Sequence, residues 1–253
     1  MPWDFVLILV VLGIAVPWRG AVRMRQLLAR GELSSADRLA LYASTIIFQW
    51  LATGIVLWRC FAHHIPAADL ALAVPRPWLT LVVALALTSL LTANQIISVR
   101  RLAHTPPERR GFLGIMARKV MPQTTVERLG FLALVVTVSL CEEILYRGFI
   151  HAVFQNLAAG SLVVGVAASA VFFASAHLYQ GRRGIATTFV AGLVFSGVRV
   201  WTGSLLPSIL GHFAADLAAG LSAPKLLRAP AHESEKEATS SAVASSDSGL
   251  FGQ

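Results

Sequence analysis

Long apolar runs constrain this sequence more than any other feature. Seven follow one another along 253 residues, and hydrophobic residues make up 56% of the chain. Most approach the roughly 20 residues that an α-helix needs to cross a bilayer, and they are continuous, whereas the strands of a membrane barrel alternate. We therefore predict an all-α fold, a polytopic transmembrane bundle of about seven spans. The runs comprise residues 3–18, 39–58, 78–98, 129–154, 161–178, 185–201 and 204–222.

The composition excludes the main alternatives to a membrane protein. Charged residues make up 13% of the chain, against about 25% in an ordinary soluble domain. The two cysteines, Cys60 and Cys141, are too few for a disulfide framework. The net charge of +8 does not indicate a nucleic-acid partner, because the basic residues lie in short loops between the apolar runs rather than on one solvated face.

The distribution of Lys and Arg predicts the orientation of the bundle. Seventeen of the 21 lie on one set of alternate sides of the seven runs and three on the other, while Arg147 lies within a run. Because cytoplasmic loops carry an excess of Lys and Arg, we expect the N-terminus outside and the C-terminus in the cytosol. The Ala- and Arg-rich composition favours a bacterial inner membrane.

The chain divides into three parts by composition. Residues 1–125 hold N-terminal spans and basic cytosolic loops, with a short interfacial helix expected within 103–128. Residues 126–222 form a helical core that carries the polar motifs. Residues 223–253 are rich in Ser, Ala and Glu, and we predict a disordered cytosolic tail.

Few ionisable residues lie deep within the apolar runs. Each one costs at least about 2.5–3.5 kcal/mol at the centre of a membrane helix, so a functional site is the first interpretation and a polar clamp between helices is the second. The acidic residues are Glu142, Glu143 and Asp216, and the histidines are His151, His177 and His212.

The spacing of these residues indicates which of them are partners. Glu143 and Arg147 are four residues apart on a helix and are expected to form an ion pair along one face. Glu142 lies about 100° round the same helix and is not paired in this way. His212 and Asp216 share a face of the last run.

The histidines and carboxylates of three runs are expected to converge on a water molecule or on a metal ion. Two histidines and a carboxylate are a usual zinc set, and a zinc-bound water is nucleophilic near neutral pH. The sequence has no HExxH motif, so the zincin arrangement does not apply.

Three motifs together resemble those of the CPBP intramembrane proteases. They are E-E-x-x-x-R (Glu142, Glu143, Arg147), F-x-x-x-H (Phe173, His177) and H-x-x-x-[ND] (His212, Asp216), in this order on successive runs. That family includes the type II CAAX prenyl endopeptidases and bacteriocin-immunity-type proteins. The resemblance covers about residues 126–222.

The resemblance implies hydrolysis of a peptide bond in a membrane protein or peptide, at a site in a membrane-embedded cavity. Glu142 would be the general base and His177 would hold the water, with Glu143 in the catalytic set and Arg147 and Phe173 in support. His212 and Asp216 would stabilise the oxyanion. In the metal-dependent form, His177, His212 and Glu142 would bind zinc or another divalent ion. Position 216 is Asp where the family more often has Asn.

Two other functions agree with these features. A non-catalytic immunity or binding protein could retain the site residues, and buried Glu, His and Asp residues also form the proton relays of transporters. We find no inverted repeat of the transporter type.

A further expectation concerns the depth of the site residues in the membrane. His177 lies near the cytosolic end of its run, while Glu142 lies about 21 Å from the cytosolic end of its own run. We therefore expect a long fourth helix and a cytosol-facing polar cavity.

Overall fold

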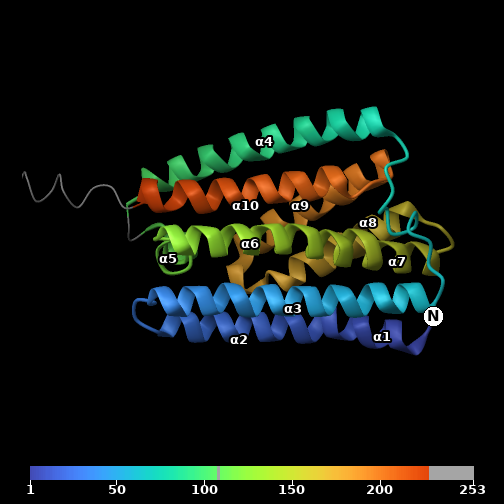
Figure 1. The fold of residues 1–253 in the computed structure, drawn as a ribbon, viewed down its shortest axis with the longest axis horizontal. Coiled ribbons are helices and arrows are strands. Elements are labelled where there is room, and N and C mark those ends of the chain that lie inside the picture. The colour runs from blue at the N-terminus through green and yellow to red at the C-terminus, as the bar shows by residue number, and fades with distance from the viewer. Residues whose placement is uncertain (107–108, 228–253) are drawn as a thin grey trace, which may run out of the picture.

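The computed structural model describes residues 1–106 and 109–227 (Figure 1). Within these ranges all regular structure is helical, which confirms the predicted all-α bundle. The expected tail lies outside the described residues from position 228 onward. Residues 223–227, assigned to that tail, are instead the last part of a helix, and Ala223 is buried against Val99.

Helices cover each of the seven apolar runs. Five are long and apolar enough to span a membrane; the other two are α8, which has 15 residues, and α10, which carries the polar His212 and Asp216. The bounds are α1 (Trp3–Val10), η1 (Val11–Ala15), α2 (Val16–Ala29), α3 (Ser35–Ala62), α4 (Pro77–Ala103), α5 (Gly111–Lys119), α6 (Thr125–Glu142), η3 (Glu143–Ile150), α7 (His151–Leu157), α8 (Leu162–Ala176), η4 (Leu178–Gln180), α9 (Gly181–Thr202) and α10 (Leu206–Leu227).

Several of these elements continue one another without a break. α1, η1 and α2 form one rod of 27 residues, and α6, η3 and α7 form another of 33 residues. The second rod is the long fourth helix expected from the sequence. It begins with Thr124, whose side chain accepts a hydrogen bond from the Glu127 backbone N–H, an N-cap that satisfies one free donor of the first turn.

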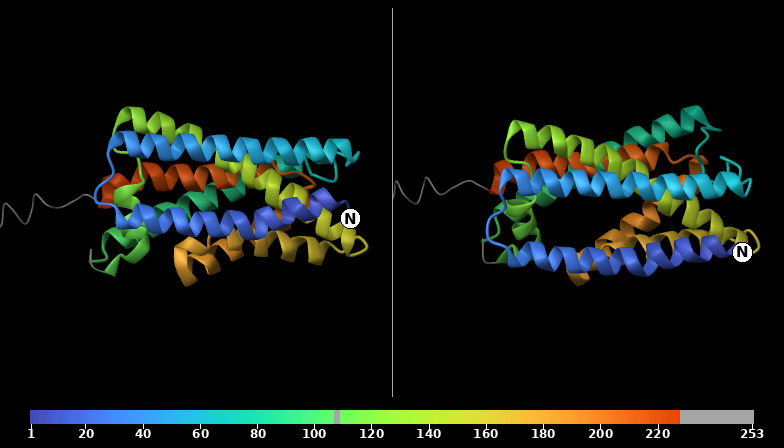
Figure 2. Two further views of the ribbon diagram at one scale, coloured as in Figure 1. Left: turned by 90° about the horizontal axis from the view of Figure 1, so that it is seen from below. Right: turned by 60° about the horizontal axis from the view of Figure 1, so that its bottom comes forward.

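The connections alternate between two ends of the bundle (Figure 1). One end, here called the N-terminal end, holds the N-terminus and the connections 63–76, 158–161 and 203–205. The other, the basic end, holds the connection 30–34, the helix α5 and the end of α10. Figure 2 shows that the turn between α8 and α9 stops well short of the basic end.

Exposed tryptophans mark the N-terminal end as a membrane interface. Trp3, Trp58, Trp78 and Trp201 lie at or near the helix ends there, and all four are more than half exposed. Tryptophan is enriched where a membrane protein meets the headgroup region. Together with the apolar helices, this belt identifies the chain as an integral membrane protein.

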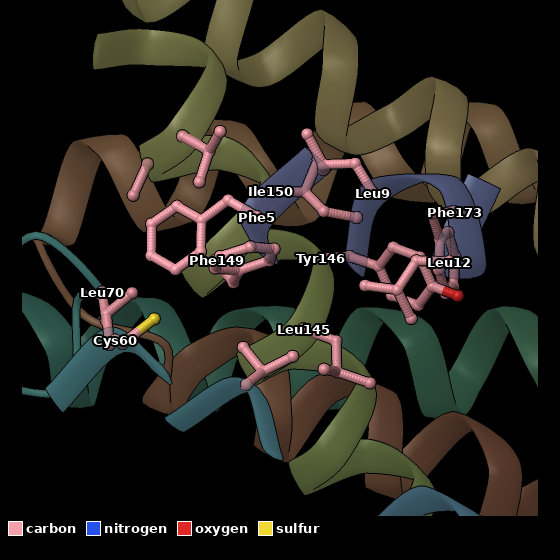
Figure 3. Close-up of a cluster of buried hydrophobic side chains, with 13 residues drawn as sticks. Phe5, Leu9, Leu12, Cys60, Leu70, Leu145, Tyr146, Phe149, Ile150 and Phe173 are labelled. Atoms are coloured by element: carbon pink, nitrogen blue, oxygen red, sulfur yellow. The ribbon is translucent and has the colours of Figure 1, made fainter. Parts of the chain in front are cut away.

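The largest buried apolar cluster surrounds η3 (Figure 3). Phe5, Leu9 and Leu12 of the first rod pack against η3, and the rings of Phe5 and Phe149 meet edge to face at 5.1 Å. Seven of the eight η3 residues are buried. The helical segment that begins at Glu143 is therefore fixed by packing on all sides.

Polar contacts tie the basic end together. Arg38 of α3 donates to both carboxylate oxygens of the buried Glu127 of α6, at 2.9 and 3.0 Å. The Lys119 ammonium of α5 donates to the carbonyls of Leu28 and Arg30 at the end of α2. These contacts hold α2, α3, α5 and α6 in register at the basic end.

Candidate active site

Glu143 is the centre of a buried polar cluster. It is the first residue of η3 and has no exposed surface. Its Oε1 accepts a hydrogen bond from Nη1 of Arg147 at 3.0 Å, which is the ion pair expected from the spacing. The same Oε1 lies 3.0 Å from Nδ1 of His212, a contact between η3 and α10 that the spacing did not predict.

The local backbone at Glu143 is a π-helix rather than an α-helix. Residues Glu143–Ile150 form η3, and π-helical turns occur frequently at functional sites. The wider turn begins directly after Glu142, which is the last residue of α6. The sequence predicted a regular helix here, because apolar periodicity does not distinguish the two over eight residues.

His212 is held on both sides. Its ring stacks on Phe195 of α9 with the centroids 5.8 Å apart and the planes at 26°. Nε2 lies 3.5 Å from Oδ2 of Asp216, one turn further along α10. This distance exceeds a normal N–H···O hydrogen bond, so Nε2 can still donate to another acceptor. Asp216 is 44% exposed at the side chain, on the side of the basic end.

Aromatic rings cover the buried guanidinium of Arg147. The guanidinium carbon lies 3.9 Å from the ring centroid of Phe173 and 5.1 Å from that of Phe195. Its Nε and Nη2 have no hydrogen-bond partner among the described residues. The attraction between the cation and the two ring faces therefore compensates for the missing hydrogen bonds. Phe173, which the sequence predicted as a supporting residue, therefore contacts Arg147, and Phe195 was not identified from the sequence.

His177 is placed by the end of α8. It is the C-cap residue, one position beyond Ala176, and its Nδ1 lies 2.8 Å from the carbonyl oxygen of Phe173. A carbonyl oxygen only accepts, so Nδ1 carries the hydrogen and Nε2 keeps a free lone pair. Such a nitrogen can accept a hydrogen bond from water. The ring of Phe173 is near both histidines, with its centroid 4.7 Å from that of His177 and 6.1 Å from that of His212.

Glu142 has a partner that sequence reasoning missed. Gln49 of α3 donates from Nε2 to Oε1 of Glu142 at 3.0 Å. The other carboxylate oxygen, Oε2, is buried and has no hydrogen-bond partner among the described residues. His177, His212 and Asp216 all lie within electrostatic range of this carboxylate. One indication of this contact was present in the sequence: Gln49 is a single amide side chain within the apolar run 39–58.

The short α8 explains how Glu142 and His177 reach the same depth. Fifteen residues separate Glu142 from the end of α7 at Leu157, and α8 itself has 15 residues before His177. Both positions therefore lie about 22 Å from the connection 158–161. The run containing His177 was expected to reach the cytosolic surface, and this is wrong because α8 ends inside the bundle.

The site lies near the middle of the bilayer. Gln49 precedes the interfacial Trp58 by nine residues on α3, which corresponds to about 13 Å along the helix. The hydrocarbon core of a bilayer is about 30 Å thick. From this distance we infer that the Glu142 carboxylate lies near the middle of the hydrocarbon core.

His177, His212 and Glu142, the expected metal ligands, do not form a metal-binding group in the described part of the chain. No three His, Cys, Asp or Glu side chains of that part of the chain lie together in a way that could hold an ion. We therefore derive no step through a metal.

His151 lies away from this cluster. It is fully buried, and a Cβ at Gly165 of α8 would come within 2.8 Å of its Nε2, so the two helices approach closely there. Two cavities of about 320 and 240 Å³ also lie away from the site, at the N-terminal end. Arg199 lines the smaller one and donates to the Asp69 carbonyl at 2.6 Å.

The bundle and its midplane cluster define a class: an integral membrane protein in which two adjacent glutamates from one helix meet histidines from two others. Residues 124–218 match the family model described as type II CAAX prenyl endopeptidase Rce1-like. This segment contains all seven motif residues and is similar to that family, whose described activity is that of a protease. Neither the comparison with curated proteins nor the comparison with solved structures gives a match.

Proposed function

We propose that the chain is an intramembrane endopeptidase that hydrolyses a peptide bond in a membrane-proximal or lipidated protein, with Glu142 activating the attacking water. The observation that supports this most directly is the state of the Glu142 carboxylate. It is buried at the bilayer midplane, and Oε2 has no hydrogen-bond partner among the described residues. A carboxylate that served only structure would be expected to have both oxygens paired.

In the reaction we propose, Glu142 acts as a general base and then as a general acid. Oε2 takes a proton from water while the water oxygen forms a bond to the peptide carbonyl carbon. The proton then passes from Glu142 to the amide nitrogen as the carbon–nitrogen bond breaks. His177 accepts a hydrogen bond from the same water through the free lone pair of Nε2, which orients the water for attack.

His212 is the group that we assign to the oxyanion. Glu143 fixes the ring through Nδ1, and Phe195 holds its plane by stacking. When His212 is protonated, Nε2–H can donate to the oxygen that becomes negative in the tetrahedral intermediate. Asp216 lies beside this nitrogen and helps to orient it. The charge of Glu143 is balanced by Arg147, so it is available to hold His212 but not to act as the base.

The test uses the purified protein in liposomes with a fluorogenic farnesylated peptide that ends in a CAAX-type sequence. The same peptide without the lipid is the second substrate, and mass spectrometry locates the bond that is cut. We expect Glu142→Gln to lower the rate by several orders of magnitude at an unchanged melting temperature. Treatment with EDTA tests the metal-dependent form, because loss of the rate and its return on adding zinc would support that route instead.

The natural substrate is found by comparing membrane proteins from cells that express the wild type or Glu142→Gln. Fragments present only with the wild type identify the cleaved proteins and the position of the bond. If the wild type cuts neither peptide and leaves no fragments, the chain is not an endopeptidase. A binding or immunity protein, or a transporter, would give that result.

A further inference from the structure

The hydrogen bond between Gln49 and Glu142 joins two separate parts of the chain. Gln49 lies on α3, outside the segment 124–218 that matches the family, whereas Glu142 ends α6. α3 and α6 pack along much of their length, and the Arg38–Glu127 ion pair fixes their register at the basic end. The amide of Gln49 is therefore held at one level of the bundle, beside the carboxylate.

The contact has a direction that matters for chemistry. Nε2 of Gln49 donates to Oε1 of Glu142, and that leaves Oε2 as the unpaired oxygen. A carboxylate can rotate about its last bond and exchange its two oxygens. A donor fixed on a neighbouring helix holds the plane of the carboxylate, so that one oxygen is bound to Gln49 and the other stays without a hydrogen bond from the described residues.

The amide itself has no second role in packing α3 against α6. Oε1 of Gln49 is buried without a hydrogen-bond partner among the described residues. Burying an unpaired amide oxygen is unfavourable by about 1–3 kcal/mol. An apolar residue would avoid that penalty, so the amide is better explained by the single bond it gives to Glu142.

We propose that Gln49 is a positioning residue for hydrolysis: its amide holds one oxygen of Glu142 so that the other faces the attacking water. This inference rests on the proposed function, since it assigns the role of Gln49 through the general base. It predicts that Gln49 affects the chemical step and leaves substrate binding unchanged. Gln49 itself does not touch the reacting atoms.

The neighbouring Trp50 provides a matched control. Its Nε1 donates to Oγ1 of Thr137 at 3.2 Å, which is another hydrogen bond between α3 and α6, one residue further along α3. Trp50→Phe removes this bond and keeps an aromatic ring, while Gln49→Met removes the other and keeps the length of the side chain. Each variant loses one hydrogen bond between the same two helices, and the melting temperatures of both check that the bundle remains folded.

The kinetic test compares these two variants on the farnesylated fluorogenic peptide in liposomes. We expect Gln49→Met to lower kcat about 10- to 100-fold at an unchanged KM, and Trp50→Phe to leave both near wild type. In the Glu142→Gln background, Gln49→Met should cause no further loss, because the group through which it acts is gone. An equal loss in both backgrounds, or a wild-type kcat for Gln49→Met, would overturn the proposal.

An infrared measurement separates this inference from the proposed function. The carbonyl stretch of a protonated carboxyl group depends on its hydrogen bonds, and the band that disappears in Glu142→Gln belongs to Glu142. We expect that band to shift in Gln49→Met and to stay in place in Trp50→Phe. If no variant affects proteolysis but the band shifts, the endopeptidase assignment fails and the contact stands. An unshifted band in Gln49→Met refutes the role of Gln49.

Discussion

Glu142 and Glu143 are adjacent in the chain, but the bundle surrounds them differently. Glu143 gives one oxygen to both Arg147 and His212, so its charge is balanced within the cluster. Within the part of the chain that the structure describes, the hydrogen bond to Glu142 comes from the neutral amide of Gln49. In a medium of low dielectric constant an unbalanced carboxylate is unfavourable, and such groups are the ones that proteins use as bases.

The first residue-scale prediction concerns the Glu143–Arg147 pair. Glu143→Ala leaves a buried, unpaired guanidinium, and we expect it to reduce the free energy of unfolding by about 3–5 kcal/mol. The double variant Glu143→Ala/Arg147→Ala should recover part of this loss. Melting temperatures in detergent measure both, and an additive effect of the two changes would contradict the pairing.

The second residue-scale prediction concerns Asp216. It lies beside Nε2 of His212 at a distance longer than a normal hydrogen bond and is partly exposed, so a neutral amide should replace it well. We expect Asp216→Asn to lower the cleavage rate by less than about tenfold and Asp216→Ala to lower it more. A rate for the Asn variant as low as that of the Ala variant would show that the negative charge is required.

The sequence predicted part of this cluster. Spacing alone gave the Glu143–Arg147 pair and the neighbouring positions of His212 and Asp216, because both are contacts within one helix. Contacts between helices were missed: the bond from His212 to Glu143, the stacking of Phe195 and the bond from Gln49. One sequence does not show which faces of two helices meet, so these needed the structure.

At the scale of elements, α8 and α9 are joined by small residues. A Cβ at Gly192 of α9 would lie 2.9 Å from Cα of Ala170, and Ser196 donates to Ser169 across the same contact at 3.1 Å. Small residues allow such close approach between membrane helices. This contact positions α8, and therefore Phe173 and His177, against the rest of the bundle.

The element-scale prediction uses two glycines of α9. Gly192→Ala should force α8 and α9 apart, reducing stability by about 1–3 kcal/mol, and should lower proteolysis because His177 moves. Gly197→Ala is the matched control, since its Cβ would meet no atom within 4 Å. We expect that variant to keep the wild-type rate and to melt no lower. Equal melting temperatures for the two would contradict the close approach.

Helix positions were easier to predict than helix ends or turns. All seven apolar runs became helices because their length and hydropathy leave the backbone no other way to satisfy its polar groups in lipid. The π-helix η3 and the early end of α8 were not visible, because both depend on how neighbouring helices pack.

At the scale of the whole molecule, the alternation of the connections leads to a prediction of orientation. In the sequence, 17 of the 21 Lys and Arg residues lie on one set of alternate sides of the seven apolar runs, and the connection 30–34 and α5, which belong to that set, lie at the basic end. We expect a reporter fused at Gln253 to be cytosolic and one inserted near Ala159 to be external. Alkaline phosphatase and green fluorescent protein fusions measure this, and phosphatase activity at Gln253 would reverse the orientation.

The early end of α8 also affects the lipid around the protein. α8 covers about 22 Å, less than the roughly 30 Å of a hydrocarbon core, while the 33-residue rod beside it is longer than the core. A bilayer adapts to a short apolar helix by local thinning among other ways, and we expect such thinning on the flank of the molecule that α8 forms. Bilayer thickness then acts on the helix that carries His177, and we expect proteolysis in liposomes to decline as the acyl chains are lengthened.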